Sequence, residues 1–220
     1  MSIQDSPPAS RSRLQRRPQQ ERSQVRFESI LTTAMRLFAE QGYEAVSMRE
    51  IARATELPIA SLYMYFPTKL SIVREIWRRY STTVAGQLEA GLERLVTSPA
   101  DHDIGTLIAD MIDLMAELQG RSPVYLEIWG VVEASPELRA LNVADTLRVM
   151  AIIGSALRRL EPRLGKAEAE SLALVLSEAA NSATKVALAL PPAARRRTLK
   201  HLKHTMVLIY RGAMAEVAKG

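Results

Sequence analysis

The sequence predicts an all-α protein with a three-helix N-terminal domain and a larger helical C-terminal domain. Ala, Leu, Glu and Arg dominate the 220 residues, and runs of alternating β-branched residues, which are typical of strands, are missing. Apolar residues recur at helical spacing between Pro and Gly residues that interrupt the chain. With 47% hydrophobic residues, the chain has ample material for a core.

The N-terminal segment, residues 1–21, is rich in Ser, Pro, Gln and Arg, so we expect a disordered arm. It contains a basic cluster of Arg11, Arg13, Arg16 and Arg17.

The first ordered helix is predicted from about Arg22 to Gln41. It carries one apolar stripe at helical spacing, and Gly42 is well placed to end it in a left-handed cap. The stripe consists of Phe27, Ile30, Leu31, Ala34, Leu37 and Phe38.

Two short helices joined by a tight turn follow. Ser47 is a good N-cap, and Glu50 three residues later completes a capping box. Pro58 ends the first helix and begins the second, in which Leu62 and Phe66, four residues apart, can pack inward. This order is typical of a helix-turn-helix, which places its second helix in the major groove of DNA.

Polar groups on and after the second helix support this interpretation. Ser61, Tyr63 and Tyr65 offer hydroxyl groups, not all of which can be buried. Lys69 lies in the first turn of the next helix, where a cation is unfavourable unless an anion such as a phosphate is held nearby.

These residues resemble the DNA-binding domain of the tetracycline-repressor-like (TetR/AcrR) transcriptional regulators. The resemblance covers about residues 26–80, and its anchors share one register. The matching residues are Ile51-Ala52, Leu62-Tyr63, Tyr65-Phe66 and Lys69, preceded by Ala34, Leu37-Phe38 and Gly42-Tyr43.

The segment also departs from the family pattern. Thr55 replaces the second alanine, Glu56 the turn glycine and Pro58 the cap serine, while Ala60 and Ser61 replace glycine and threonine. We therefore expect a differently shaped turn and a base preference that cannot be copied from a relative.

The resemblance implies a set of DNA-contacting residues within this segment. Arg49 would reach a base edge or a phosphate, and Ser61 and Tyr63 would read or brace the groove. Ile59 and Ala60 would make apolar contacts, and the remaining members would hold phosphates. The full set is Ser47, Arg49, Ile59, Ala60, Ser61, Tyr63, Tyr65 and Lys69.

The charge distribution fits DNA binding. Residues 1–80 hold 13 Lys/Arg and 8 Asp/Glu, so the whole formal net charge of +5 lies there. Positive charge attracts phosphates without regard to sequence, although ordinary surface charge is the alternative. The basic arm could enter a minor groove, with a solvated tail as the commoner alternative.

Beyond the DNA-binding domain, 22–68, we predict a connecting helix at 69–98 that couples it to an effector-binding and dimerisation domain at 99–220. Helical patterns interrupted by Pro or Gly divide this second domain. They are Ile104 to Gln119, Val124 to Val132, a helix that starts at Pro136 and includes Leu157, Lys166 to Leu190, and Ala193 to about Ala218.

The last two helices have more apolar surface than one side needs. Such pairs can form a four-helix bundle with a symmetry mate, as the resemblance also implies, whereas an intramolecular hairpin is the alternative. The two strips are Leu172, Leu176, Ala180, Ala183 and Ala187, and Leu202, Met206, Ile209 and Ala213.

The resemblance further implies a small-molecule effector held inside the second domain, with loss of DNA affinity when it binds. Adaptable methionines and large aromatic residues could line such a pocket, although plain core packing explains them too. The candidates are Met111, Met115, Tyr125, Trp129 and Met150. Glu127 could orient a cationic ligand, with a solvated carboxylate as the alternative.

Other functional classes find little support. The chain has no Cys, and His201 and His204 without a nearby carboxylate or Cys are a weak metal signal. Neither a glycine-rich phosphate loop nor a nucleophile–base pair is present, so we expect no cofactor and no catalysis. The N-terminus does not look like a secretory signal, and no apolar run approaches the ~20 residues that cross a bilayer.

The sequence therefore predicts a cytoplasmic, ligand-responsive DNA-binding transcriptional regulator without membrane association. As a homodimer through its two C-terminal helices, it would bind a palindromic operator in double-stranded DNA and act as a repressor that a small-molecule effector releases. A helical adaptor without specific DNA binding, anchored through Tyr63 and Tyr65, is the alternative.

Overall fold

The computed structural model describes residues 11–100, 103–120 and 124–219, apart from the side chains of residues 11–20 and 126. Within them the chain forms helices α1 to α9 and no strand, which confirms the all-α prediction. The chain divides into an N-terminal unit, Met1–Ile72, and a C-terminal unit, Val73–Gly220. The division falls inside α4, Lys69–Thr97, for which the sequence predicts a separate connecting segment at 69–98.

The first helix, α1, spans Arg11–Gln41 and so begins well before the predicted start. The prediction of a disordered arm at 1–21 is wrong from Arg11 on, while residues 1–10 and the side chains of the basic cluster lie outside the described part. Most residues of this stretch are Arg, Gln or Glu, which have high helix propensity, and Pro18 is the residue in it that opposes a helix. At the other end, Gly42 adopts a φ of 82°, which is the predicted left-handed cap.

The core of the N-terminal unit joins α1 to two short helices, α2 at Met48–Ala54 and α3 at Ile59–Tyr65. The Ser47 hydroxyl accepts a hydrogen bond from the Glu50 N–H at 3.2 Å, but in the described structure the Glu50 carboxylate accepts no bond from the Ser47 N–H that would complete the box. Apolar side chains from all these segments are buried together. They are Ile30, Ala34, Phe38, Val46, Ile51, Leu62, Phe66 and Ile72.

The turn between α2 and α3 depends on Glu56, whose φ of 55° lies in the left-handed region. The Thr55 hydroxyl donates to the Ile51 carbonyl at 2.8 Å, and the Leu57 N–H donates to the Ala52 carbonyl at 3.0 Å. These bonds satisfy carbonyls at the end of α2, as a glycine-containing turn would. Glu56, in place of the glycine of the family pattern, thus introduces backbone strain. The turn still has a left-handed residue at this position, so the expectation of a differently shaped turn is wrong here.

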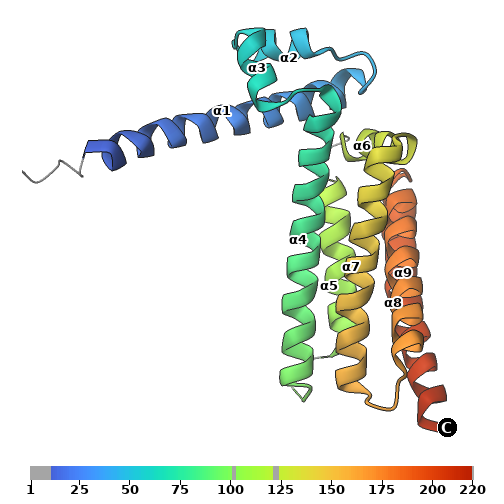
Figure 1. Ribbon diagram of the computed structural model, residues 1–220. Helices are drawn as coiled ribbons and strands as arrows, with labels where there is room; N and C mark the ends of the chain where they lie inside the picture. The colour runs from blue at the N-terminus through green and yellow to red at the C-terminus, as the bar shows by residue number, and fades with distance from the viewer. Residues whose placement is uncertain (1–10, 101–102, 121–123, 220) are drawn as a thin grey trace, which may run out of the picture. The chain divides into compact units, whose positions relative to one another are not determined.

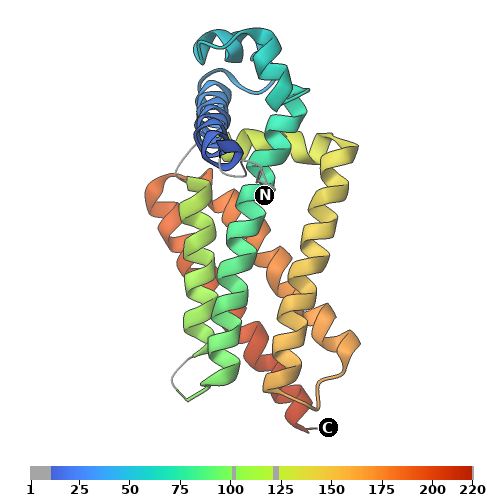
Figure 2. The same cartoon turned by 60° about the vertical axis from the view of Figure 1, so that its left-hand side comes forward.

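The C-terminal unit is a bundle of long helices (Figures 1 and 2). From Val73 on, α4 runs lengthwise next to α5 and α7, α8 and α9 run along the other side of the bundle, and α6 lies across one end. The bounds lie within a few residues of those predicted, because Pro and Gly mark nearly every break. They are Ile104–Gly120 for α5, Val124–Ala134 for α6, Pro136–Leu160 for α7, Lys166–Leu188 for α8 and Pro192–Lys219 for α9.

Much of the apolar surface of α8 and α9 is already used within this unit. Ala180, Leu202 and Met206 are buried against Ile112 and Met115 of α5. The interpretation of both strips as surplus is therefore wrong at these positions, because sequence periodicity shows that a face is apolar but not which neighbour covers it. Other apolar side chains stay exposed, namely Leu174, Val175 and Val186 on α8 and Leu208 on α9.

By length and composition alone, α7 could cross a membrane, and it is the one such helix in the described part of the chain. The prediction that no apolar run reaches this length is therefore wrong for α7. However, Asp145 and Arg148 lie near the middle of α7, and charged groups at a bilayer centre cost about 2.5–3.5 kcal/mol each. In the structure α7 packs against α8 and α6.

The left-handed backbone at Glu56 leads to a stability prediction. Replacing Glu56 by Gly should raise the free energy of unfolding by about 0.5–1 kcal/mol, because glycine relieves most of the strain but gains freedom in the unfolded chain. Urea denaturation followed by far-ultraviolet circular dichroism measures the change. Glu56→Ala is the control, since it removes the carboxylate but keeps the Cβ atom; an equal gain from alanine would show that strain is not the cause.

Candidate DNA-binding surface and ligand cavity

The inner side of α3 ties this short helix to the rest of the N-terminal unit. Leu62 is fully buried, and Phe66 directly after α3 stacks on Phe27 of α1 with ring centroids 4.9 Å apart. A helix of seven residues is marginal by itself, so these contacts hold it in place. They also determine which side chains of α3 must point outward.

The outer face of α3 is apolar except for one phenol. Ile59 is 37% exposed, Tyr63 48% and Met64 86%, and Ala60 is exposed beside them. These positions follow one another at i, i+1, i+4 and i+5, so they share one side of the helix. No Arg, Lys, Asn or Gln occurs in α3, so this helix has no side chain that could form a bidentate hydrogen bond to a base.

Sequence reasoning overlooked Met64, which is the most exposed large apolar side chain of the described residues. Its position between two tyrosines could have indicated an exposed site, because Leu62 and Phe66 define the buried side.

Four more predicted DNA-contacting residues differ in their exposure and in the hydrogen bonds that they already form. Arg49 on α2 is exposed, and Ser61 is half-buried. Ser47 is exposed but its hydroxyl caps α2. Tyr65 is half-buried; its hydroxyl accepts a hydrogen bond from Ser23 at 3.3 Å, so α1 holds it in part.

Lys69 has partners within its own unit. Its Nζ atom donates to the carbonyl of Tyr43 at 2.5 Å and to that of Glu44 at 3.3 Å, and it lies 4.0 Å from the centroid of the Tyr43 ring. The ammonium group therefore compensates carbonyls of the segment that follows α1, a role that the sequence pattern does not predict.

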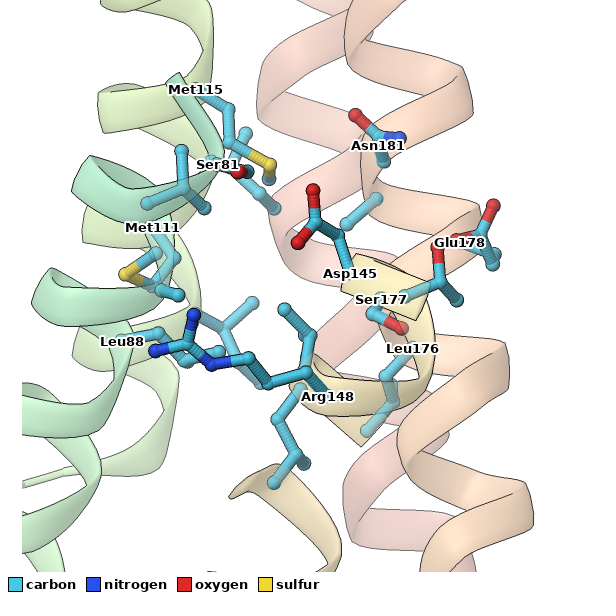
Figure 3. Close-up of a pocket in the computed structure, with 18 of the residues that line it drawn as sticks. Ser81, Leu88, Met111, Met115, Asp145, Arg148, Leu176, Ser177, Glu178 and Asn181 are labelled. Atoms are coloured by element: carbon cyan, nitrogen blue, oxygen red, sulfur yellow. Dashed lines mark hydrogen bonds between the residues drawn. The ribbon is translucent and has the colours of Figure 1, made fainter. Parts of the chain in front are cut away.

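The C-terminal unit contains a cavity of about 170 Å³, shown in Figure 3. Apolar side chains from α4, α5, α7 and α8 form most of its wall, with smaller contributions from α6 and α9. The predicted residues Met111, Met115 and Trp129 line it.

Two predicted lining residues, Tyr125 and Met150, are not part of the wall. Tyr125 lies behind it, with its ring centroid 5.8 Å from that of Tyr80. Val149 takes the wall position on α7, because neighbouring residues of a helix point about 100° apart. The sequence pattern missed the aromatic and charged residues of the wall, chiefly Trp77, Tyr80, Asp145 and Arg148.

An aromatic cluster forms one end of the cavity. The rings of Trp77 and Trp129 meet edge to face at 4.6 Å, and Tyr80 lies 5.6 Å from Trp77. The Tyr80 hydroxyl accepts a hydrogen bond from the Gln119 amide at 2.5 Å. Burial raises the pKa of Tyr80 to about 12, so this phenol stays neutral at physiological pH.

Charged groups lie on the α7 and α8 side of the cavity. Asp145 Oδ2 accepts a hydrogen bond from Trp77 Nε1 at 3.0 Å, and Glu178 Oε1 accepts one from the Thr146 hydroxyl at 3.0 Å. In Figure 3 the Arg148 side chain extends toward Leu88, whereas the Asp145 carboxylate points away from the Arg148 guanidinium.

The two histidines of α9, which the sequence gives only as a weak metal signal, lie on the surface. His201 and His204 are both exposed, and the described residues contain no group of three or more potential metal ligands.

Comparison with known families finds matches over most of the chain. Residues 30–76 match the model of the bacterial regulatory proteins of the tetR family, and residues 103–210 match the tetracyclin repressor-like C-terminal domain. The first match covers the helix-turn-helix, and the second covers the bundle from α5 to most of α9.

Two curated relatives are similar over part of their length. The HTH-type transcriptional regulator AcrR of Shigella flexneri is 35% identical over 86 residues, which are 39% of this chain and 38% of the relative. The HTH-type transcriptional repressor KstR2 of Rhodococcus jostii is 33% identical over 127 residues, 48% of this chain and 62% of the relative. The chain thus spans less than two thirds of either relative.

Solved structures share the fold. A putative TetR-family regulator from Mesorhizobium loti has a TM-score of 0.66 at 16% identity, covering 86% of this chain and 96% of the other. A putative transcriptional regulator from Saccharomonospora viridis in complex with choline has a TM-score of 0.60 at 24% identity, covering 83% and 95%.

Taken with the α2–α3 geometry, the two family matches lead to one assignment. The chain belongs to the TetR family of bacterial transcriptional regulators, and its N-terminal unit is the DNA-binding helix-turn-helix domain of that family.

Proposed function

We propose that the protein is a transcriptional repressor that binds a palindromic operator as a homodimer and is released by a small-molecule effector. The observation that carries the proposal is the outer face of α3, which stays exposed while the inner face is fully packed. Two such faces in a dimer would enter successive major grooves about 34–36 Å apart.

The cavity supports the effector part of the proposal. It lies in the unit that matches the family's C-terminal domain, and α4 supplies part of its wall, beginning at Trp77. The same helix starts at Lys69 in the N-terminal unit, so it would couple the two units. An effector would act by binding more tightly to the arrangement that does not fit DNA. A solved relative in complex with choline is consistent with a small organic ligand here.

Within the N-terminal unit, we assign Arg49, Ser47, Tyr65 and the remaining N–H of Lys69 to phosphate-side contacts. The α3 face, with Ser61 at its edge, would approach the bases. Because α3 has no side chain for bidentate hydrogen bonds, its discrimination would come from Tyr63 and from apolar contacts of Ile59, Ala60 and Met64 with thymine methyl groups.

Removing the Arg49 charge should weaken binding to all duplexes. Arg49→Ala is expected to reduce the slope of log affinity against log salt concentration by about one unit, because one phosphate contact is lost. Fluorescence anisotropy with a labelled duplex at several salt concentrations measures the slope. Arg36→Ala, which removes a charge on α1 that already pairs with Glu40 at 2.9 Å, is the control. Equal slopes for the wild type and Arg49→Ala would contradict the contact.

Removing thymine methyl groups should weaken specific binding. In a duplex recovered by selection from a random pool, uracil in place of a contacted thymine is expected to lower affinity about fourfold per methyl, the equivalent of ~0.8 kcal/mol. Met64→Ala or Ile59→Ala should reduce this penalty, whereas Arg49→Ala should leave it unchanged. If uracil duplexes bind as well as thymine duplexes throughout the half-site, apolar readout by α3 is wrong.

The exposed residues of α8 and α9 are the proposed dimer surface. Val175 and Val186 are eleven positions apart and fall on the same side of α8, given about 3.6 residues per turn. Replacing both by Asp should convert a dimer into a monomer in sedimentation-velocity experiments, because two charges would be buried unpaired. Val143→Asp, at an equally exposed position on α7, should leave the dimer intact. The opposite pattern would move the interface to α7.

A further inference from the structure

The cavity contains one recessed carboxylate with little compensation. Asp145 is half-buried on α7 in a wall that is mostly apolar but also includes the neutral polar residues Asn142, Ser177 and Asn181. Its Oδ2 atom accepts a hydrogen bond from the neutral indole N–H of Trp77 at 3.0 Å, and no other hydrogen bond or ion pair of Asp145 occurs in the described part of the chain. A cation placed beside this carboxylate would therefore meet a negative charge whose one recorded partner in the described residues is a neutral donor.

Aromatic rings adjoin this carboxylate. Trp77 and Trp129 both line the cavity with their ring planes 83° apart, so they present a face and an edge in different directions. Indole faces attract cations by about 0.5–2 kcal/mol, with the larger values in places that exclude water. A carboxylate beside tryptophan rings is therefore a suitable site for an organic ammonium group.

The protein already uses this combination once at the same aromatic cluster. The ammonium group of Lys185 lies 5.0 Å from the centroid of the Trp129 ring and pairs with Glu133 at 2.6 Å. In the cavity, Trp77 and Asp145 offer a ring and a carboxylate, and no ion pair recorded among the described residues supplies a cation to Asp145.

The other charges of the wall do not neutralise Asp145. Glu178 adds a second carboxylate, so Arg148 is the only cation among three charged wall residues. Arg148 is exposed, and Figure 3 shows its guanidinium extending toward Leu88 and Met111 rather than along the direction of the Asp145 carboxylate.

The size of the cavity limits the ligand. Its volume of about 170 Å³ is close to the ~150 Å³ apolar cavity that accommodates one benzene molecule in another protein. One ring or a compact alkyl group with a small charged group would fill it.

We propose that the cavity binds a small organic cation, with Asp145 as its counter-ion, the indole ring of Trp77 against the charged group and the apolar wall around its body. This inference rests on the proposed effector function and adds the chemical class of the effector.

The test compares molecules of one shape and different charge. Phenyltrimethylammonium is the cation, tert-butylbenzene its neutral isostere and benzenesulfonate an anion. Trp77 and Trp129 are the only two tryptophans of the chain and both line the cavity, so intrinsic fluorescence of the full-length protein reports binding there. We expect the cation to bind at least tenfold more tightly than the isostere or the anion.

Asp145→Asn isolates the charge, because asparagine keeps an oxygen that accepts the Trp77 N–H bond. The variant should lose at least tenfold in affinity for phenyltrimethylammonium and bind tert-butylbenzene as the wild type does. Asp110→Asn removes the same charge from an exposed position outside the cavity and should bind the cation as the wild type does. If Asp145→Asn fails to fold, the comparison of the three molecules on the wild type still decides the question.

The proposal is overturned if the isostere or the anion binds as tightly as the cation, or if Asp145→Asn binds the cation unchanged. A DNA-release assay distinguishes failure of the cation proposal from failure of the proposed effector function. A neutral or anionic molecule that enters the cavity and releases DNA would refute the cation class and uphold effector control. A cation that binds selectively without releasing DNA would uphold the class and count against effector control.

Discussion

The burial of one side of α3 is the constraint on which recognition depends. Leu62 and Phe66 are packed inside the N-terminal unit, and Phe66 stacks on Phe27 of the long first helix. With that side determined, helical geometry leaves Ile59, Ala60, Tyr63 and Met64 facing outward. The chemistry available for reading a base is therefore decided by which residues are needed for the core. The outcome is a surface with methyl groups, a thioether and a phenol but without amide or guanidinium groups.

Much of this architecture could be predicted, because the chain marks its helix ends with residues that have strong local preferences. Gly42, Pro58 and Pro136 each lie at or next to a helix boundary, and the apolar stripe of α1 is buried from Ile30 to Phe38. The predicted start of α1, at about Arg22, was wrong. Ser, Pro and Arg are also common in disordered segments, and composition alone does not distinguish a polar helix from a disordered arm. The contacts of Lys69 with two backbone carbonyls come from a tertiary arrangement that a sequence pattern does not encode.

The cavity shows the same limit. Periodicity indicates which side of a helix is apolar, and three of the five predicted wall residues line the cavity. Met150 is not part of the wall because neighbouring residues of a helix point about 100° apart, and Val149 takes that position. Tyr125 shares a face of α6 with Trp129 but lies next to Tyr80, behind the wall. Asp145 was missed because a carboxylate on an amphipathic helix usually faces solvent. Its hydrogen bond to Trp77 joins residues 68 positions apart, which no local pattern could indicate.

The shortness of α2 and α3 has a consequence for how the protein can fail. Each has only seven residues, too few to persist without the surrounding core. Substitutions at Phe27 or Ile51, neither of which would touch a nucleotide, would then loosen α3 and raise amide hydrogen exchange there while the C-terminal bundle keeps its protection. Genetic screens for lost DNA binding should accordingly recover interior positions as well as surface ones.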